Sequence, residues 1–286
     1  MATLGLGILL FATLVLTVSS SGAPLDPYNT GDEGTSRLID GRQTEAVSSF
    51  DRLESPSKTG TAIIVGGTRR LTTADIAAVS SLLDRGGTVV VITEEPATNE
   101  LLAQLGAETR LGSSQLLLPE TDQPGPRSQF TLTARTADHP IDGAQVNIAV
   151  PVGTTQSAAG TNRTILAWAS EPVGRDRNSD GQIGPDEPVG QYPVAVRESV
   201  GAGQLTVVGD ASLLLNGLWK IDGNRAFATA ITDGPTTVVY PQTGTFPRVT
   251  QLRFALRTTV GTSVAVGLVF VGAVVGGRLA VWLHRW

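Results

Sequence analysis

The feature that most constrains this chain is the contrast between its two apolar ends and its polar middle. Residues Ala2–Val18 carry no charged side chain, and neither do residues Val260–Val275. A helix of roughly 20 predominantly apolar residues is long enough to cross a bilayer. The sequence therefore predicts an N-terminal anchor or signal segment at 1–20, a water-exposed domain at 24–245 and a C-terminal transmembrane helix at 258–283.

The residues after the second apolar segment indicate its direction. Arg278 and Arg285 follow that segment, and Trp282 and Trp286 lie where aromatic side chains favour the membrane interface. Positive charge in short flanking segments marks the cytoplasmic side. We therefore expect a cell-membrane protein whose C-terminus is cytoplasmic and whose main domain is extracytoplasmic.

The N-terminal segment allows two interpretations. The small residues of Ser19–Ala23 resemble a signal-peptide cleavage region, but no basic residue precedes the apolar stretch. We favour an uncleaved anchor, and a cleaved signal is the alternative.

Composition excludes several classes of function. The formal net charge is -5, and Lys58 and Lys220 are the only lysines. An acidic domain disfavours nucleic acid, because phosphate binding needs clustered Lys and Arg. The chain has no cysteine, which excludes disulfides, thiolate metal sites and a Cys nucleophile.

The middle of the chain begins as an α/β domain with a parallel sheet. The apolar run Thr61–Val65 predicts a buried strand, Thr72 is placed to cap a helix, and Thr88–Ile92 predicts a second strand. A strand, a helix and a second strand make a βαβ unit. Gln204–Val208 predicts a further strand, and Asn224–Ile231 predicts a helix.

Between about residues 113 and 200 the pattern changes to short alternating runs. Proline and glycine clusters separate these runs, which predicts a β-rich insertion or extension. The predicted strands are 115–118, 130–134, 146–150, 164–169 and 192–196.

The sharpest local motif is the twelve-residue segment Asp176–Glu187. Its spacing matches an EF-hand calcium loop, with a glycine at the sixth position for the sharp bend and an acidic residue at the twelfth. Pro185 and Pro188 exclude a full exiting helix. The motif predicts a structural Ca²⁺ site on a β–β loop, and a solvated acidic turn is the alternative. Its ligands would be Asp176, Asn178, Asp180, Gln182 through its carbonyl, and Glu187.

Two groups of polar residues are candidates for ligand binding. The first opens a helix predicted to begin at Thr35 or Ser36, and the second follows the strand Gln204–Val208. Polar residues at the carboxyl edge of a parallel sheet often line a ligand crevice. The alternative is helix capping and turn chemistry. The candidates are Asp26, Tyr28, Asn29, Thr35 and Ser36, with Asp210, Ser212, Asn216 and Asn224.

A catalytic constellation is not evident. Asp210, Ser212 and His139 could serve an exported hydrolase, but no GxSxG motif accompanies them. We therefore expect a non-enzymatic domain with no catalytic residues, and the hydrolase is the alternative function.

Three motifs carry a family resemblance. Asp26-Pro-Tyr-Asn-Thr-Gly, Gly86-Gly-Thr-Val-Val-Val and Gln204-Leu-Thr-Val-Val-Gly-Asp resemble the membrane-anchored domain-of-unknown-function 4350 family, in its haloarchaeal form. The resemblance implies a flavodoxin-like fold similar to that of class I glutamine amidotransferases. Enzymes of that fold use a Cys nucleophile, which this chain lacks, so glutaminase activity is not expected.

The resemblance also implies a role and partners. Family members often lie beside genes for MoxR-type ATPases and von Willebrand-type membrane proteins. The expected function is therefore a scaffold or ligand-binding component of a membrane complex, with a carbohydrate as one ligand class and no cofactor other than Ca²⁺.

Overall fold

The two predicted membrane segments, Ala2–Val18 and Val260–Val275, lie outside the residues that the structure describes. The computed structural model describes residues 21–40, 44–54, 60–67, 71–119, 128–135, 140–147, 149–154, 162–231, 234–241 and 243–259. None of the helices in these ranges is long and apolar enough to cross a membrane. The chain divides into one compact unit, Ser20–Phe246, and a second unit that contains α6 (Arg248–Thr259).

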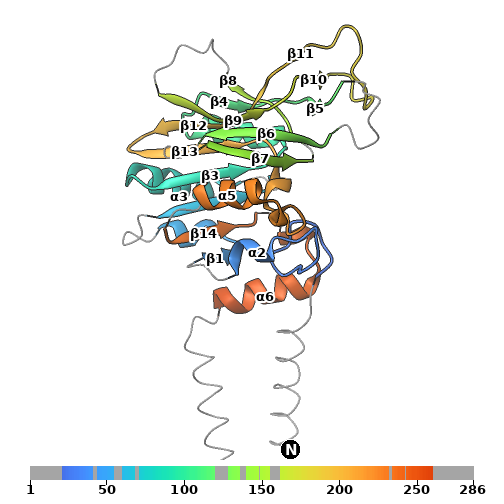
Figure 1. Ribbon diagram of the computed structural model, residues 1–286. Coiled ribbons are helices and arrows are strands. Elements are labelled where there is room, and N and C mark those ends of the chain that lie inside the picture. The colour runs from blue at the N-terminus through green and yellow to red at the C-terminus, as the bar shows by residue number, and fades with distance from the viewer. Residues whose placement is uncertain are drawn as a thin grey trace, which may run out of the picture. The chain divides into compact units, whose positions relative to one another are not determined.

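A mixed β-sheet forms the centre of the unit Ser20–Phe246. Among the described residues it has nine strands in the order β1-β14-β2-β3-β13-β12-β9-β6-β7 (Figure 1). The first five are parallel: β1 (Thr44–Val47), β14 (Thr236–Val239), β2 (Thr61–Val65), β3 (Thr88–Ile92) and β13 (Gly203–Val208). The others are antiparallel: β12 (Pro193–Val200), β9 (Arg163–Ala169), β6 (Phe130–Arg135) and β7 (Pro140–Val146).

The parallel half of the sheet is built from continuous apolar runs, as expected for strands buried on both faces. All five residues of β2 are buried. Helix α3 (Thr73–Asp84) connects β2 to β3 and packs its buried Val79 and Leu82 into the core cluster of those strands. Thr72 caps this helix as predicted, because its hydroxyl accepts from the Asp75 amide while the Asp75 carboxylate accepts from the Thr72 amide.

The β-rich segment continues the same sheet, so the sheet is mixed rather than wholly parallel. Strand β12 pairs antiparallel with β13 through a turn at Gly201, whose φ of 60° favours glycine. Because five neighbouring strands of this sheet are parallel, the predicted α/β class with a parallel sheet is confirmed for that part of the sheet. Two smaller sheets have the orders β11-β10-β5 and β4-β8. Their strands are β11 (Val189–Gly190), β10 (Val173–Asp176), β5 (Gln115–Leu117), β4 (Thr109–Leu111) and β8 (Val152–Thr154).

The strand predicted at 146–150 is wrong in extent: β7 ends at Val146, and the Val150 amide donates to the Gly209 carbonyl at 2.8 Å. The helix predicted to begin at Thr35 or Ser36 does begin at Ser36, as α2 (Ser36–Ile39), but the Thr35 side chain does not cap it. The remaining helices are η1 (Phe50–Glu54), η2 (Pro96–Thr98), α4 (Asn99–Gln104), η3 (Ala211–Leu214), η4 (Leu218–Lys220), α5 (Asp222–Ile231) and η5 (Thr243–Thr245).

Candidate functional site

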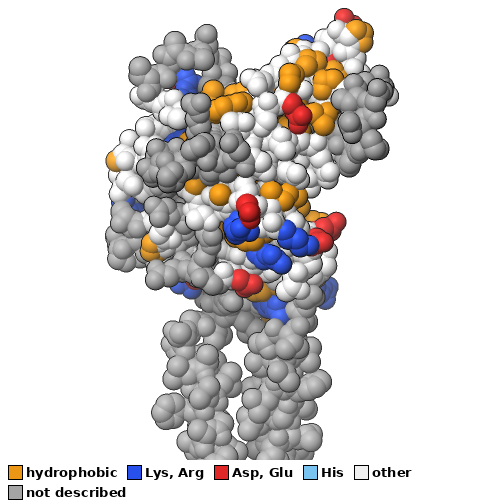
Figure 2. All heavy atoms as spheres, in the orientation of Figure 1, with side chains coloured by type: hydrophobic (Ala, Val, Ile, Leu, Met, Phe, Trp, Pro, Cys, Tyr) orange, Lys and Arg blue, Asp and Glu red, His pale blue; other side chains and the backbone are white. Residues whose placement is uncertain are grey.

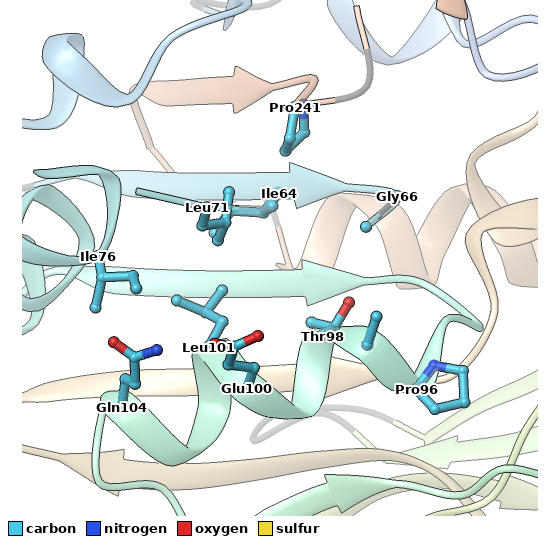
Figure 3. A pocket seen from close by; sticks show the side chains of 12 residues that line it. Ile64, Gly66, Leu71, Ile76, Pro96, Thr98, Glu100, Leu101, Gln104 and Pro241 are labelled. Atoms are coloured by element: carbon cyan, nitrogen blue, oxygen red, sulfur yellow. The ribbon is translucent and has the colours of Figure 1, made fainter. Parts of the chain in front are cut away.

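A cavity of about 460 Å³ lies at the carboxyl edge of the parallel strands. Gly66 and Gly67 follow β2, Pro241 follows β14, and η2 and α4 follow β3 (Figure 3). Parallel strands bring their carboxyl ends to one edge, and open α/β sheets bind ligands in the crevice there. The cavity therefore occupies the position that this topology favours for a binding site.

A glycine allows the two walls of the cavity to meet. A Cβ atom on Gly67 would lie 2.3 Å from the Thr98 hydroxyl oxygen and 3.4 Å from that of Thr93. The first distance is far below a van der Waals contact. Gly67 thus permits η2 to approach the end of β2 closely.

The cavity combines apolar walls with a few polar groups. Figure 3 shows Leu71 and Ile76 facing the side chains of Leu101 and Glu100 across the space. Thr98 is 7% exposed, and its hydroxyl oxygen has no hydrogen-bond partner among the described residues. A buried hydroxyl without a partner costs about 1–3 kcal/mol, so a ligand that bonds to it would recover that free energy. The complete lining is Ile64, Gly66, Gly67, Leu71, Ile76, Pro96, Ala97, Thr98, Glu100, Leu101, Gln104 and Pro241.

An acidic pair, Glu94 and Glu95, connects β3 to η2 in the chain. Partial burial, together with the neighbouring Glu94 carboxylate, raises the pKa of Glu95 above its ordinary value. The Glu95 amide donates to the Thr93 hydroxyl at 3.1 Å, which holds the turn into η2.

The predicted ligand-binding residues do not line this cavity. Asn216 of the second group is bonded to the first group: its side-chain amide donates to the carbonyls of Asn29 at 3.0 Å and Gly31 at 2.8 Å, and to the Ser36 hydroxyl at 3.2 Å. The side-chain oxygen of Asn216, Oδ1, accepts from the Arg37 amide at 3.0 Å. These buried contacts join the N-terminal loop to the segment after η3.

The other members of the first group are also bonded within the protein. The Asp26 carboxylate accepts from the Tyr28 amide at 2.8 Å. The Thr35 hydroxyl donates to the Leu25 carbonyl at 3.0 Å and lies 2.9 Å from the Tyr240 hydroxyl. Burial is the main cause that raises the pKa of Tyr240. The Thr35 hydroxyl is thus a buried tertiary contact rather than the predicted helix cap.

Residues of the second group form hydrogen bonds with the end of β7 and the residue after it. Asp210 accepts from the amide and hydroxyl of Ser212 at 2.6 and 2.7 Å, and from the Asn147 amide at 2.8 Å. The Asn224 side chain accepts from the Gln145 amide at 2.8 Å and donates to its carbonyl at 2.9 Å. Asp210 and Ser212 thus bond the residue after β7, and Asn224 joins α5 to β7.

The Ser212 hydroxyl is buried and takes part in two hydrogen bonds within the protein. The Ser212 hydroxyl is 7% exposed, donates to Asp210 and accepts from the Asn147 amide at 3.0 Å. His139, the third member of the hydrolase alternative, lies outside the described residues.

The predicted calcium loop connects β10 to β11. Asp176 ends β10 and is 3% exposed, while Asn178, Asp180 and Gln182 are exposed. Glu187 is half-buried just before β11. The described part of the chain contains no group of three or more His, Cys, Asp or Glu side chains that could hold a metal ion.

Basic and acidic side chains both lie on the face of the molecule that Figure 2 shows, and some of them form ion pairs. Lys220 on η4 lies 3.0 Å from Asp32 of the N-terminal loop, and Arg225 pairs with Asp222 on α5. Such exposed pairs contribute little to stability.

Sequence reasoning missed Thr98, Glu100 and Gln104 as site residues. The usable signal was the Gly66-Gly67 pair directly after a buried strand, followed by a capped helix. That pattern marks a carboxyl edge where backbone must approach closely. It was overlooked because the polar residues after β13 were richer in Asp, Ser and Asn.

The fold and cavity define a mixed α/β domain with a candidate small-molecule site at the carboxyl edge of its sheet. The chain belongs to the family described as Domain of unknown function (DUF4350), whose model matches residues 27–232. The family predicted from the three sequence motifs is therefore confirmed. No curated protein matches the chain.

Several solved structures resemble parts of the domain. The N-terminal domain of mmIFT52 is 11% identical, with a TM-score of 0.40, over 72% of this chain and 83% of that chain. A cytoplasmic protein of Salmonella typhimurium LT2 is 11% identical, with a TM-score of 0.38, over 69% and 78%. The exo-beta-1,4-mannosidase Op5Man5 of the Opitutaceae bacterium strain TAV5 is 14% identical, with a TM-score of 0.33, over 62% and 25%. This chain thus spans a quarter of the mannosidase, and these scores carry no conclusion about function.

Proposed function

We propose that this protein is a non-catalytic binding domain that holds a small polar ligand in the cavity between β2, β14 and α4. The observation that carries the proposal is the Thr98 hydroxyl, which is buried against the cavity without a hydrogen-bond partner. A bound ligand would supply that partner.

The lining selects a chemical class of ligand. Thr98, Glu100 and Gln104 offer a hydroxyl, a carboxylate and an amide on one wall. Leu71 and Ile76 offer apolar surface. A carboxylate repels phosphates and other anions, whereas sugar rings combine hydroxyl groups with apolar C–H faces. A neutral carbohydrate therefore fits these walls best, and cavities of this size are typical of small-molecule sites.

The same lining favours binding over catalysis. Glu100 is the one ionisable side chain among the described residues that line the cavity. Hydrolysis of a glycosidic bond commonly uses a pair of carboxyl groups, and acyl transfer uses a nucleophile with a base. The cavity walls supply neither pair.

The setting of this domain is part of the proposal. The uncharged stretches Ala2–Val18 and Val260–Val275 would anchor it in the cell membrane, with the domain outside the cytoplasm. Such tethering raises the local concentration of a binding domain for membrane partners. We place the domain in a flavodoxin-like, amidotransferase-related fold group of haloarchaeal type. A scaffold role beside a MoxR-type ATPase or a von Willebrand-type protein would then be coupled to ligand occupancy.

The test is thermal unfolding of the full chain in mild detergent against a panel of neutral mono- and oligosaccharides. A saturable rise in Tm identifies a ligand, since binding to the folded state stabilises it. We expect Glu100→Gln and Thr98→Val each to weaken the binding of that ligand about tenfold. Glu33→Gln, which changes the same charge at an exposed site in the N-terminal loop, is the matched control. A panel without any shift, or a shift unchanged in both cavity variants, would overturn the proposal.

A further inference from the structure

We propose that the loop Asp176–Glu187 binds one Ca²⁺ ion, at a site separate from the ligand cavity. Its oxygen donors stand at the first, third, fifth, seventh and twelfth positions, the spacing of calcium loops. Spacing and acidity alone do not make a metal site. A second observation is that one of these carboxylates has a buried oxygen without a hydrogen-bond partner among the described residues.

That carboxylate belongs to Asp176, the last residue of β10. Asp176 is 3% exposed, and one of its oxygens, Oδ2, accepts from the Gly181 amide across the loop at 2.9 Å. The other, Oδ1, is buried and has no hydrogen-bond partner among the described residues. A buried carboxylate oxygen without a partner is costly. A cation inside the loop would neutralise it.

The loop already holds the neighbouring donors in position. The side-chain oxygen of Asn178, Oδ1, accepts from the Asp180 amide at 3.1 Å, and Asp180 Oδ1 accepts from the Gln182 amide at 2.9 Å. Gly181 provides the sharp bend, with a φ of 78°. Ile183 anchors the loop, because its side chain fills the space where Gly174 of β10 has no Cβ.

Glu187 completes the ligand set. Its carboxylate accepts from the Arg177 amide at 2.6 Å and from the Gly184 amide at 2.9 Å, so it bridges the two ends of the loop. These backbone hydrogen bonds lower the pKa of Glu187, and the group stays charged over the physiological range. Ca²⁺ binding would draw Glu187 from these amides onto the ion, which explains why three acidic side chains are not already gathered here.

The chemistry of the donors selects the ion. Asp176, Asp180 and Glu187 supply carboxylates, while Asn178 and the Gln182 main chain supply neutral oxygens. An all-oxygen set of this spacing suits Ca²⁺ rather than Zn²⁺, which prefers nitrogen and sulfur, or Mg²⁺, which demands near-octahedral geometry. The ion would tie the β10–β11 connection to β5, since Asp176 pairs with Gln115.

The experiment compares the full chain in detergent with CaCl₂, MgCl₂ and EDTA, by calorimetric titration and by Tm. We expect one Ca²⁺ per chain with a Kd on the order of 10⁻⁴ M, as in extracellular calcium modules, and a Tm that rises with Ca²⁺ but not with Mg²⁺. Asp176→Asn and Glu187→Gln should each weaken the binding of Ca²⁺ at least tenfold. Asp176→Asn should leave the Tm in EDTA unchanged or higher, because it removes a buried charge.

Asp186→Asn is the matched control, because Asp186 is an exposed acid of the same loop at a position that supplies no ligand. It should bind Ca²⁺ within about twofold of the parent chain. No titratable Ca²⁺ binding in the millimolar range would overturn the proposal. So would equal weakening in Asp186→Asn and Asp176→Asn, which would indicate general charge attraction. Thr98→Val alters the ligand cavity and leaves the loop Asp176–Glu187 intact. Ca²⁺ binding by this variant therefore tests the calcium site independently of the ligand cavity.

Discussion

The side-chain nitrogen of Asn216 lies 3.0 Å from the carbonyl oxygen of Asn29, which is 187 positions earlier in the chain. The same amide also bonds Gly31 and Ser36. One buried side chain therefore fixes the N-terminal loop to the segment after η3. Asn216, Asn29 and Ser36, which the sequence offered as ligand-binding candidates, here form hydrogen bonds that join two distant segments of the domain.

Replacing Asn216 by Ala should destabilise the domain severely. The change takes the Asn216 side chain away from the buried Asn29 carbonyl and from the Arg37 amide, and buried unpaired polar groups cost about 1–3 kcal/mol each before relaxation. We expect a loss of about 2–4 kcal/mol in the free energy of unfolding, measured by urea denaturation. Gln104→Ala, at an exposed amide on α4, should stay within about 0.5 kcal/mol of the parent. Equal effects of the two changes would contradict the role of Asn216.

Ser212→Ala separates the structural role of this pair from the hydrolase alternative. We expect a loss of about 1–2 kcal/mol in stability, because the Ser212 hydroxyl bonds both Asp210 and Asn147. Ligand binding in the cavity should be unchanged. The measurements are urea unfolding and a panel of ester and glycoside substrates. Hydrolysis by the parent chain that disappears in the Ser212→Ala chain would establish the enzyme instead.

Gly67→Ala should test the close approach at the cavity. The new Cβ would lie 2.3 Å from the Thr98 hydroxyl oxygen, and overpacking of this kind costs about 1–3 kcal/mol. Thr98→Ala in the same chain removes the opposing atom, so the double variant should recover at least half of the loss. A double-mutant cycle by urea unfolding measures this coupling. Strictly additive effects would show that the two residues do not meet.

Glu95→Gln should stabilise the protein in a pH-dependent way. The pKa of Glu95 is raised in the folded state from an ordinary value of 4.5, so its contribution to stability is full below that value. That contribution is lost as the pH rises through the folded pKa. Glutamine carries no such charge, and the Tm gain should be present near about pH 7 and absent near about pH 4. Glu33→Gln serves as the exposed control, and a gain that persists at the lower pH would refute the explanation.

Local physics made several elements predictable. Strands β2 and β3 match the predicted ranges Thr61–Val65 and Thr88–Ile92 residue for residue, because short apolar runs rich in β-branched residues favour strands that are buried on both faces of a sheet. The helix after Thr72 was also predictable, since its capping box lies within the four residues Thr72–Asp75. The family was predictable for the same reason, because each of its three motifs lies within a short, continuous segment of the chain.

The role of each polar residue was decided by tertiary structure. Whether Asn216 binds a ligand or a loop depends on Asn29 and Ser36, and whether Thr98 faces a cavity depends on Gly67, which lies in another segment. The sequence by itself determined the apolar ends, the parallel strands and the spacing of the acidic residues in the loop Asp176–Glu187. Only the folded chain decided which polar groups find hydrogen-bond partners within the protein, because partners distant in sequence are brought together by packing.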